Sequence, residues 1–335
     1  MKLSQEAGPR PRPAGAGSAE SVGLAESVGP AGSAGSAGIG VGTAFGTFGE
    51  LLQGVLPEAD GDFLVTLPVA RWTMATFRQE LESGSGDVVV RPARKTKALQ
   101  LARTISEMAT RRTGMPTGGT LHVNSVIPEG KGLASSSADL VATARAVGQA
   151  LGVAMPPSRI ERLLADIEPT DGVLYPAIVA FHHRTVRLRG VLGSLPVMAV
   201  VGIDEGGSVD TVDFNRIPKP FTLADQYEYA RLLDRLACAV RRRDLAEVGR
   251  VATRSAQMNQ LLRHKWTLEP MREICREVGG LGVAVAHSGT TLGILLDADD
   301  PSYTQRVSAA AQACGELVGG VTVYRTLTFA TPAGC

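Results

Sequence analysis

The sequence lacks the features that mark several large classes of protein. It has 34 lysines and arginines against 33 aspartates and glutamates, and this net charge of +1 provides no broad basic surface for a nucleic acid. Its four cysteines form no CxxC pair, so neither a zinc site nor a disulfide framework is indicated. No run of about 18 apolar residues occurs, so no membrane span is expected. We therefore expect a cytoplasmic protein that binds neither nucleic acid nor membrane.

The chain divides into three parts by composition and length. Residues 1–38 are almost all glycine, alanine, serine and proline, and they repeat AESVG twice. Such a segment has little to bury, so we expect a disordered tail, which lacks the continuous apolar region of a secretory signal. The remaining chain is too long for one small core and mixes strands and helices in both halves. We expect two α+β domains, over 39–192 and 193–335.

From residue 39 onward, apolar residues recur at the spacings of strands and helices. The segment 63–80 alternates apolar and polar residues and is rich in valine and threonine, as strands are. The segment 96–112 has helical spacing and a basic end, which the negative end of a helix dipole favours. Further strands are expected over 119–128, 195–204, 283–297 (broken by a glycine turn) and 320–329, and further helices after Ser137 and over 156–169, 222–243, 244–264, 271–280 and 301–315.

One stretch, SVIPEGKGLASSSADLVATARAVG (125–148), places glycines, a lysine and three serines directly before a helical pattern. A glycine loop that leads into a helix leaves backbone N–H groups unpaired at the positive end of the helix dipole. This arrangement suits an anion, most often a phosphate group. The alternative is an ordinary serine N-cap after a turn.

A second stretch, AHSGTTLGILLD (286–297), places a small polar turn between two apolar strands. Taken alone it is best explained as a hairpin turn. Together with the glycine–serine loop it suggests another interpretation. A kinase needs one loop for the nucleotide phosphates and further groups that close over the transferred phosphoryl.

These stretches resemble motifs of the GHMP kinase superfamily. PEGKGLASSSAD (128–139) is similar to its phosphate loop, GTAFGTFGELLQG (42–54) to its N-terminal motif, and 286–297 to its C-terminal glycine motif. The resemblance implies an α+β fold, with an N-terminal domain like ribosomal protein S5 domain 2, a ferredoxin-like C-terminal domain, and an active site between them. GELLQG, GKGLASSSAD, EPTDGVLYPAIVAF and SVDTVDFN are most similar to the L-threonine kinases of cobalamin side-chain synthesis.

The resemblance also implies which residues bind the cofactors, ATP and Mg²⁺. The loop would wrap the ATP phosphates through its backbone, and Ser136 would place its hydroxyl on Mg²⁺. Lys131 would add a point charge to the phosphates or, alternatively, remain a solvated loop lysine. The residues expected to bind the nucleotide are Pro128, Gly130, Lys131, Gly132, Leu133, Ala134, Ser135, Ser136 and Ser137.

Asp171, in EPTDG, matches the position of the family's catalytic aspartate. It would accept or orient the substrate hydroxyl proton; the alternative is an aspartate that starts a turn with Gly172. Glu161 and Glu168 are both candidates for a second metal ligand, and the sequence leaves the choice open. Several relatives carry a lysine or arginine six residues before the motif glutamate, where this chain has Ala44. Asp171 and the metal would then contribute more of the catalysis, and Ser136 is the other residue expected to take part in it.

The resemblance implies that the substrate is a hydroxy amino acid. L-Threonine is the leading candidate, and it would become O-phospho-L-threonine. Glu50 would bind the ammonium group, Asp171 the hydroxyl, and Ser288, Gly289 and Thr290 an anion, either the carboxylate or the γ-phosphate of ATP. Serine, homoserine and non-protein hydroxy amino acids remain alternatives. So does a catalytically silent ligand sensor on the same fold, and a homodimer is left open.

Overall fold

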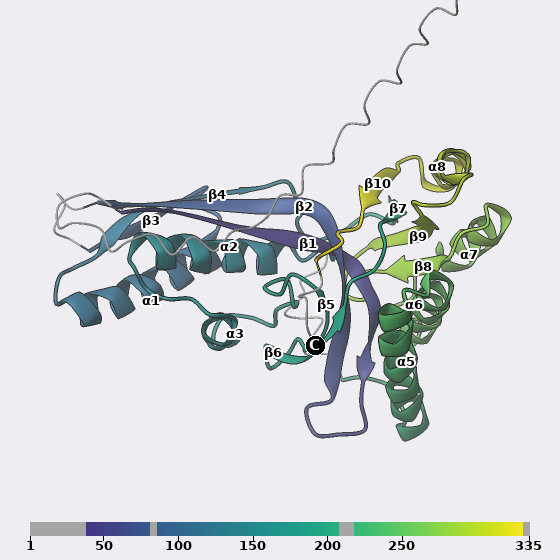
Figure 1. Cartoon of the computed structure of the whole chain (residues 1–335), viewed down its shortest axis with the longest axis horizontal. Helices are drawn as coiled ribbons and strands as arrows, with labels where there is room; N and C mark the ends of the chain where they lie inside the picture. The colour runs from purple at the N-terminus through teal and green to yellow at the C-terminus, as the bar shows by residue number, and fades with distance from the viewer. Residues whose placement is uncertain (1–37, 81–85, 208–217, 331–335) are drawn as a thin grey trace, which may run out of the picture. The chain divides into compact units, whose positions relative to one another are not determined.

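Two long strands connect the parts of the chain that the structure describes. The computed structural model describes residues 38–80, 86–207 and 218–330, all within one compact unit that begins at residue 37. Most of the predicted tail and the motif SVDTVDFN therefore lie outside the described residues. β1 and β2 pair antiparallel along most of their lengths and bend through the centre of Figure 1. The domain boundary at 192/193 stays a prediction.

The described strands form one ten-stranded sheet. Its order is β10-β7-β9-β8-β1-β2-β4-β3, with β5 paired to β2 and β6 paired to β5. The strands are β1 (Ile39–Val55), β2 (Asp62–Glu80), β3 (Val88–Arg91), β4 (Gly118–Ser125), β5 (Ile178–His182), β6 (Arg187–Gly193), β7 (Met198–Asp204), β8 (Gly282–Val285), β9 (Thr291–Asp297) and β10 (Thr322–Arg325).

The helices pack in two groups. α1 and α2 lie on one side of β1, β2 and β4, whereas α6 and α7 pack on β8, and α8 packs on β7 and β9 (Figure 1). The helices are α1 (Thr96–Thr113), α2 (Ser135–Ala150), α3 (Pro157–Ala165), α5 (Leu223–Arg242), α6 (Leu245–Asn259), α7 (Leu268–Glu277) and α8 (Tyr303–Val318). Among the described residues, no helix is both long enough and apolar enough to cross a membrane.

The α+β class and most of the predicted elements are confirmed. The predicted helices over 156–169 and 244–264 end earlier than expected, at Ala165 and Asn259. β1 was not predicted, because its glycines interrupt the alternation of apolar side chains. At Gly42 the structure shows why glycine is needed: a Cβ atom there would lie 2.2 Å from the carbonyl oxygen of Ala142 in α2. The strand therefore has glycine where the helix backbone packs directly on it.

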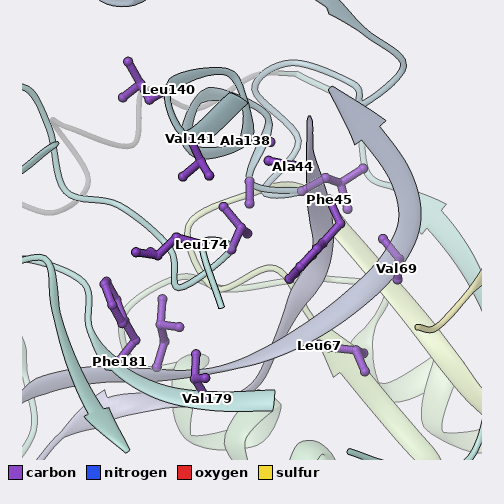
Figure 2. Close-up of a cluster of buried hydrophobic side chains, with 14 of the residues drawn as sticks. Ala44, Phe45, Leu67, Val69, Ala138, Leu140, Val141, Leu174, Val179 and Phe181 are labelled. Atoms are coloured by element: carbon purple, nitrogen blue, oxygen red, sulfur yellow. The ribbon is translucent and has the colours of Figure 1, made fainter. Parts of the chain in front are cut away.

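The core beside the site is built by residues from both ends of the N-terminal half. Figure 2 shows Phe45 of β1, Val69 of β2 and Val141 of α2 around one apolar interior, with Leu174 and Phe181 nearby. Phe45 is 4 % exposed and Phe181 is fully buried. Burying a side chain of this size contributes on the order of 1.5–3 kcal/mol, so this core holds the first turn of α2 firmly against β1.

Candidate active site

A cavity of about 420 Å³ opens where the N-terminal ends of α1 and α2 meet. β1, the segment after α3, and the turn between β8 and β9 complete its walls. Its polar lining includes most of the side chains that the sequence singled out. The lining residues are Glu50, Arg94, Lys95, Thr96, Lys97, Ala98, Glu129, Gly130, Gly132, Leu133, Ala134, Ser135, Ser136, Ser137, Asp139, Leu140, Glu168, Pro169, Asp171 and Ser288.

The loop before α2 leaves the start of that helix open. Gly130, Gly132 and Ala134 all have positive φ, at 72°, 82° and 59°, and Ala134 is the N-cap residue. No side-chain hydrogen bond caps the helix, although three serines follow. The first backbone N–H groups of α2 therefore border the cavity without a capping side chain, as an anion-binding helix terminus requires.

The glycine–serine loop and the C-terminal glycine turn are in direct backbone contact. A Cβ atom on Gly289 would lie 2.2 Å from the carbonyl oxygen of Lys131 and 2.5 Å from the Cα of Gly132. The N–H of Thr290 and the hydroxyl of Thr291 both donate to the Lys131 carbonyl, at 3.3 and 3.1 Å. The two sequence motifs thus meet, and glycine is required where they do.

Ser136 and Glu168 bring a hydroxyl and a carboxylate together in the cavity, where they could hold a metal ion. The Ser136 hydroxyl donates to Oε1 of Glu168, and the ammonium of Lys97 bonds to Oε2 of the same carboxylate. One hydroxyl and one carboxylate fit the oxygen preference of Mg²⁺, which usually takes few protein ligands beside phosphate and water. Within the described ranges no three His, Cys, Asp or Glu side chains gather as a metal site.

Glu161 lies apart from this pair. Its Oε1 accepts hydrogen bonds from the Tyr175 hydroxyl and from the N–H of Leu188, both at 2.8 Å, and it does not line the cavity. The carboxylate therefore ties α3 to β6. Of the two glutamates between which the sequence could not decide, Glu168 is the one beside Ser136.

Asp171 lies at the cavity wall next to Ser137. The Asp171 N–H donates to the Ser137 hydroxyl oxygen at 3.1 Å, and Oδ2 lies 3.4 Å from the same oxygen. Burial, followed by the nearby charges of Glu50 and Glu168, raises the pKa of Asp171 from 3.8 to about 7. A carboxylate with this pKa is well suited to accept a proton near neutral pH.

Glu50 is held by His287, which lies in the turn between β8 and β9. Its Oε2 accepts hydrogen bonds from the backbone N–H of His287 at 3.0 Å and from Nδ1 of the same histidine at 2.7 Å. His287 Nε2 lies 2.8 Å from the hydroxyl of Ser255, which accepts from the N–H of Gln53. Among the described residues, no donor is bonded to Oε1 of Glu50, and the residue lines the cavity. Glu50 therefore has one fixed oxygen and one available oxygen.

Several residues expected to bind the nucleotide or the substrate do not line this cavity. The Lys131 ammonium forms an ion pair with Asp204 at 2.6 Å and, together with Pro128, lines a separate cavity of about 350 Å³. Thr290 donates its hydroxyl to Asp204 at 2.5 Å, and the Gly289 carbonyl accepts from the buried Lys265 at 2.7 Å. Of the three turn residues, only Ser288 lines the larger cavity.

Sequence reasoning missed a basic wall at the start of α1. Lys95 bonds to Glu129 at 2.6 Å and to the buried Asp139, whose other oxygen accepts from Thr73 at 2.9 Å. Burial lowers the pKa of Lys95, but its bonds to Asp139 and Glu129 outweigh this, and the pKa is raised. The signal was the segment PARKTKA (92–98), where basic residues precede a helix whose positive end disfavours them.

Comparison with known families gives this geometry its context. The family model "GHMP kinases N terminal domain" matches residues 97–178, and the model "GHMP kinases C terminal" matches residues 236–316. The chain belongs to the GHMP kinase family. This GHMP kinase is a phosphotransferase that acts on a hydroxyl group, as its motifs predicted.

Its relatives are similar over much of their length. An L-threonine kinase of Citrobacter freundii is 28% identical over 250 residues, which cover 74% of this chain and 83% of that protein. An L-threonine kinase of Salmonella typhimurium is 30% identical over 178 residues, covering 52% and 59%. A homoserine kinase structure from Cytophaga hutchinsonii aligns with a TM-score of 0.65 at 17% identity, covering 87% and 95%. The predicted GHMP kinase fold is thus confirmed.

The structure also places the one position at which this GHMP kinase departs from the expected pattern. Ala44 is fully buried in β1, and it lies near Ala138 of α2 in Figure 2. No cationic side chain reaches the cavity from that position.

Proposed function

We propose that this GHMP kinase transfers the γ-phosphoryl group of ATP to the side-chain hydroxyl of an amino acid, with L-threonine as the preferred substrate. One observation carries the proposal. The available oxygen of Glu50 and the carboxylate of Asp171 border the same cavity as the open N-terminus of α2. The names of the two relatives that are 28 and 30% identical support L-threonine in particular.

The nucleotide phosphates would bind at the start of α2. Its free N–H groups and the positive end of its dipole favour a polyanion. Ser136 and Glu168 would hold Mg²⁺, which, when bound, would neutralise charge on the phosphate oxygens. Leu133 and Ala134 would contribute backbone, because the sharp turn at Ala134 directs the chain into the helix.

Asp171 would act on the substrate hydroxyl. As the bond between the hydroxyl oxygen and the γ-phosphorus forms, the bond from that phosphorus to the β-phosphate oxygen breaks, and ADP leaves. The hydroxyl proton passes to the Asp171 carboxylate. Because the pKa of Asp171 is about 7, the residue can accept this proton near neutral pH.

Glu50 would bind the ammonium group of the amino acid. Its Oε2 is fixed by His287, so Oε1 can take a charge-assisted hydrogen bond from the substrate. Burial of Glu50 to 5 % exposure makes a cationic partner valuable, since an unpaired buried carboxylate is costly. In the turn between β8 and β9, Ser288 is the residue that lines the cavity, and it would bind the substrate carboxylate.

A substrate comparison tests the proposal. Purified full-length protein would receive ATP, Mg²⁺ and either L-threonine, L-serine or L-homoserine, with ADP release and the phosphorylated product measured. We expect kcat/KM for L-threonine to exceed that for L-serine by about 10- to 200-fold, the usual value of one methyl group in a fitted pocket. L-2-aminobutyrate, which lacks the hydroxyl, should inhibit competitively, and 3-hydroxybutyrate, which lacks the ammonium, should be a poor substrate.

The outcomes separate the alternatives. A higher kcat/KM with L-homoserine would support the proposed phosphoryl transfer but would show that L-threonine is not the preferred substrate. Efficient turnover of 3-hydroxybutyrate would contradict the role of Glu50. No ADP release with any amino acid, despite nucleotide binding, would favour a ligand sensor.

A further inference from the structure

The first turn of α1 carries a lysine where its own helix disfavours one. Lys97 is the second residue of α1, and that first turn contains no acidic residue. A cation at the positive end of a helix costs roughly 0.3–1 kcal/mol when nothing compensates it. Lys97 nevertheless lines the cavity, and 45% of its side-chain surface remains exposed. Helix stability alone does not account for this residue.

The neighbouring cations have other carboxylate partners. Lys95 is only 11% exposed and bonds to both Glu129 and Asp139. Arg94 is 67% exposed and pairs at 3.5 Å with Oε1 of Glu129, the same oxygen that Lys95 contacts. Lys131 is bound to Asp204 outside this cavity. Among the described residues of this wall, Lys97 is the cation whose carboxylate partner, Glu168, also accepts a hydrogen bond from the first turn of α2.

Lys97 is linked to the start of α2 through Glu168. Glu168 accepts from Ser136 through Oε1 and from Lys97 through Oε2, so one carboxylate joins the lysine to the first turn of α2. The terminal phosphate of a nucleotide bound there would carry more negative charge than the single carboxylate of Glu168. An ammonium on a flexible four-carbon stem can exchange one partner for the other.

We propose that Lys97 is a catalytic residue whose ammonium leaves Glu168 to bind the γ-phosphoryl oxygens of ATP during transfer. It stays protonated throughout: the proton goes from the hydroxyl to Asp171, and Lys97 only offsets the charge on the transferred group. The inference rests on the proposed nucleotide position at α2. It does not depend on which amino acid is phosphorylated.

Nucleotide binding tests this role without turnover. The affinities of the full-length protein for AMP-PNP and for ADP, each with Mg²⁺, would be measured by calorimetry in the parent, Lys97→Met and Lys97→Arg. We expect Lys97→Met to weaken AMP-PNP binding about tenfold or more and ADP binding less than threefold. Lys97→Arg should restore AMP-PNP binding, and kcat should fall about 100-fold or more in Lys97→Met only.

A matched control lies on the same helix. Arg103 is exposed on α1 and does not line the cavity, so Arg103→Met removes one positive charge without changing either affinity. Equal loss of AMP-PNP and ADP binding in Lys97→Met, or no loss of either, would show that Lys97 only neutralises Glu168. If Lys97→Met does not fold, Lys97→Gln, which also lacks the positive charge, should show the same selective loss of AMP-PNP binding. A parent protein that binds AMP-PNP but phosphorylates no amino acid would overturn the proposed substrate and leave this inference standing; one that binds no nucleotide would overturn both.

Discussion

The N-termini of α2 and α5 contain similar side chains and use them differently. At α5, Thr222 accepts from the N–H of Asp225, and the Asp225 carboxylate accepts from the N–H of Thr222 at 2.8 Å. This capping box satisfies two helix donors within the chain. At α2, the hydroxyls of Ser136 and Ser137 bond to the carboxylates of Glu168 and Asp171 instead, and no side chain caps the helix.

The difference shows that the backbone N–H groups without a side-chain cap are at the start of α2 and not at the start of α5. A cap contributes about 1 kcal/mol to helix stability, and the chain has the residues to build one at α2. Ala134, the N-cap residue, has a left-handed backbone, and the hydroxyls of Ser136 and Ser137 bond to nearby carboxylates instead of capping the helix. Changes at the α2 end should therefore affect activity more than stability, and changes at the α5 end should do the reverse.

The largest effect is expected at Asp171. Asp171→Asn should lower kcat by about 100- to 10,000-fold, since a general base contributes that much, while the KM of the amino acid changes little. In the parent, kcat/KM should rise with pH and level off above about 7, because the raised pKa keeps the carboxyl protonated below that point. Steady-state kinetics from pH 5.5 to 9 would measure both; an acidic limb retained in Asp171→Asn would assign it to another group.

Asp171→Asn should lower kcat but should raise thermal stability relative to the parent as pH rises. A carboxyl with a raised folded-state pKa stabilises the protein at low pH, and this contribution is lost as pH rises from about 4 to 7. Relative to the parent, Asp171→Asn should gain thermal stability across that window and then stay level. A melting series at constant ionic strength would show it, and a constant difference would indicate that the pKa is not raised.

A smaller effect is expected at Glu50. Glu50→Gln keeps the shape and removes the charge, and a charge-assisted contact contributes about 1.5–3 kcal/mol. We therefore expect kcat/KM for the amino acid to fall about 10- to 100-fold, while the KM for ATP is unchanged. Unaltered efficiency with L-threonine would assign Glu50 a purely structural role as the partner of His287.

Gly132 tests the backbone of the open end. Gly132→Ala introduces a Cβ atom 2.4 Å from that of Ala286 at a residue with φ of 82°. The left-handed conformation alone costs about 1–2 kcal/mol, so the KM for ATP should rise about 5- to 30-fold. Gly114→Ala is the control: φ there is 73°, no atom lies within 4 Å, and the residue ends α1 away from the cavity. It should lose stability and keep the parent KM; equal KM values in both variants would contradict the loop's role.

The smallest effect on activity is expected at α5. Thr222→Ala removes the cap and should lower the free energy of unfolding by about 1 kcal/mol and the melting temperature by about 2–4 °C. Turnover and both KM values should stay within error of the parent. A clear loss of activity would mean that the capped end is coupled to the site, and the contrast between the two helices would not hold.

The local parts of the site were predictable from the sequence. Glycines before Ser135 mark a loop that needs positive φ, and the helical spacing after Ser137 marks the helix that follows. Both are properties of a few consecutive residues. The same holds for Asp171, whose motif lies within five positions.

The partners of the charged side chains were not predictable, because they depend on sheet order. Lys131 turns to Asp204, which lies on a strand of the C-terminal half, and Glu161 turns to β6. Lys97 at the start of α1 reaches Glu168, in the segment after α3, across an interval of 71 positions in the chain. Spacing along the chain contains no information about these contacts, so the choice between Glu161 and Glu168 needed the fold.

The contact between Glu50 and His287 has a consequence for biosynthesis. The two residues are 237 positions apart in the chain. At about 5–20 residues per second, a ribosome needs roughly 12–47 seconds to synthesise that interval. During this time the carboxylate of Glu50 emerges without its histidine, and the glycine–serine loop before α2 emerges without the glycine turn that packs on it. A nascent chain can therefore contain α2 early, but the lining of the 420 Å³ cavity is complete only when translation has passed the β8–β9 turn.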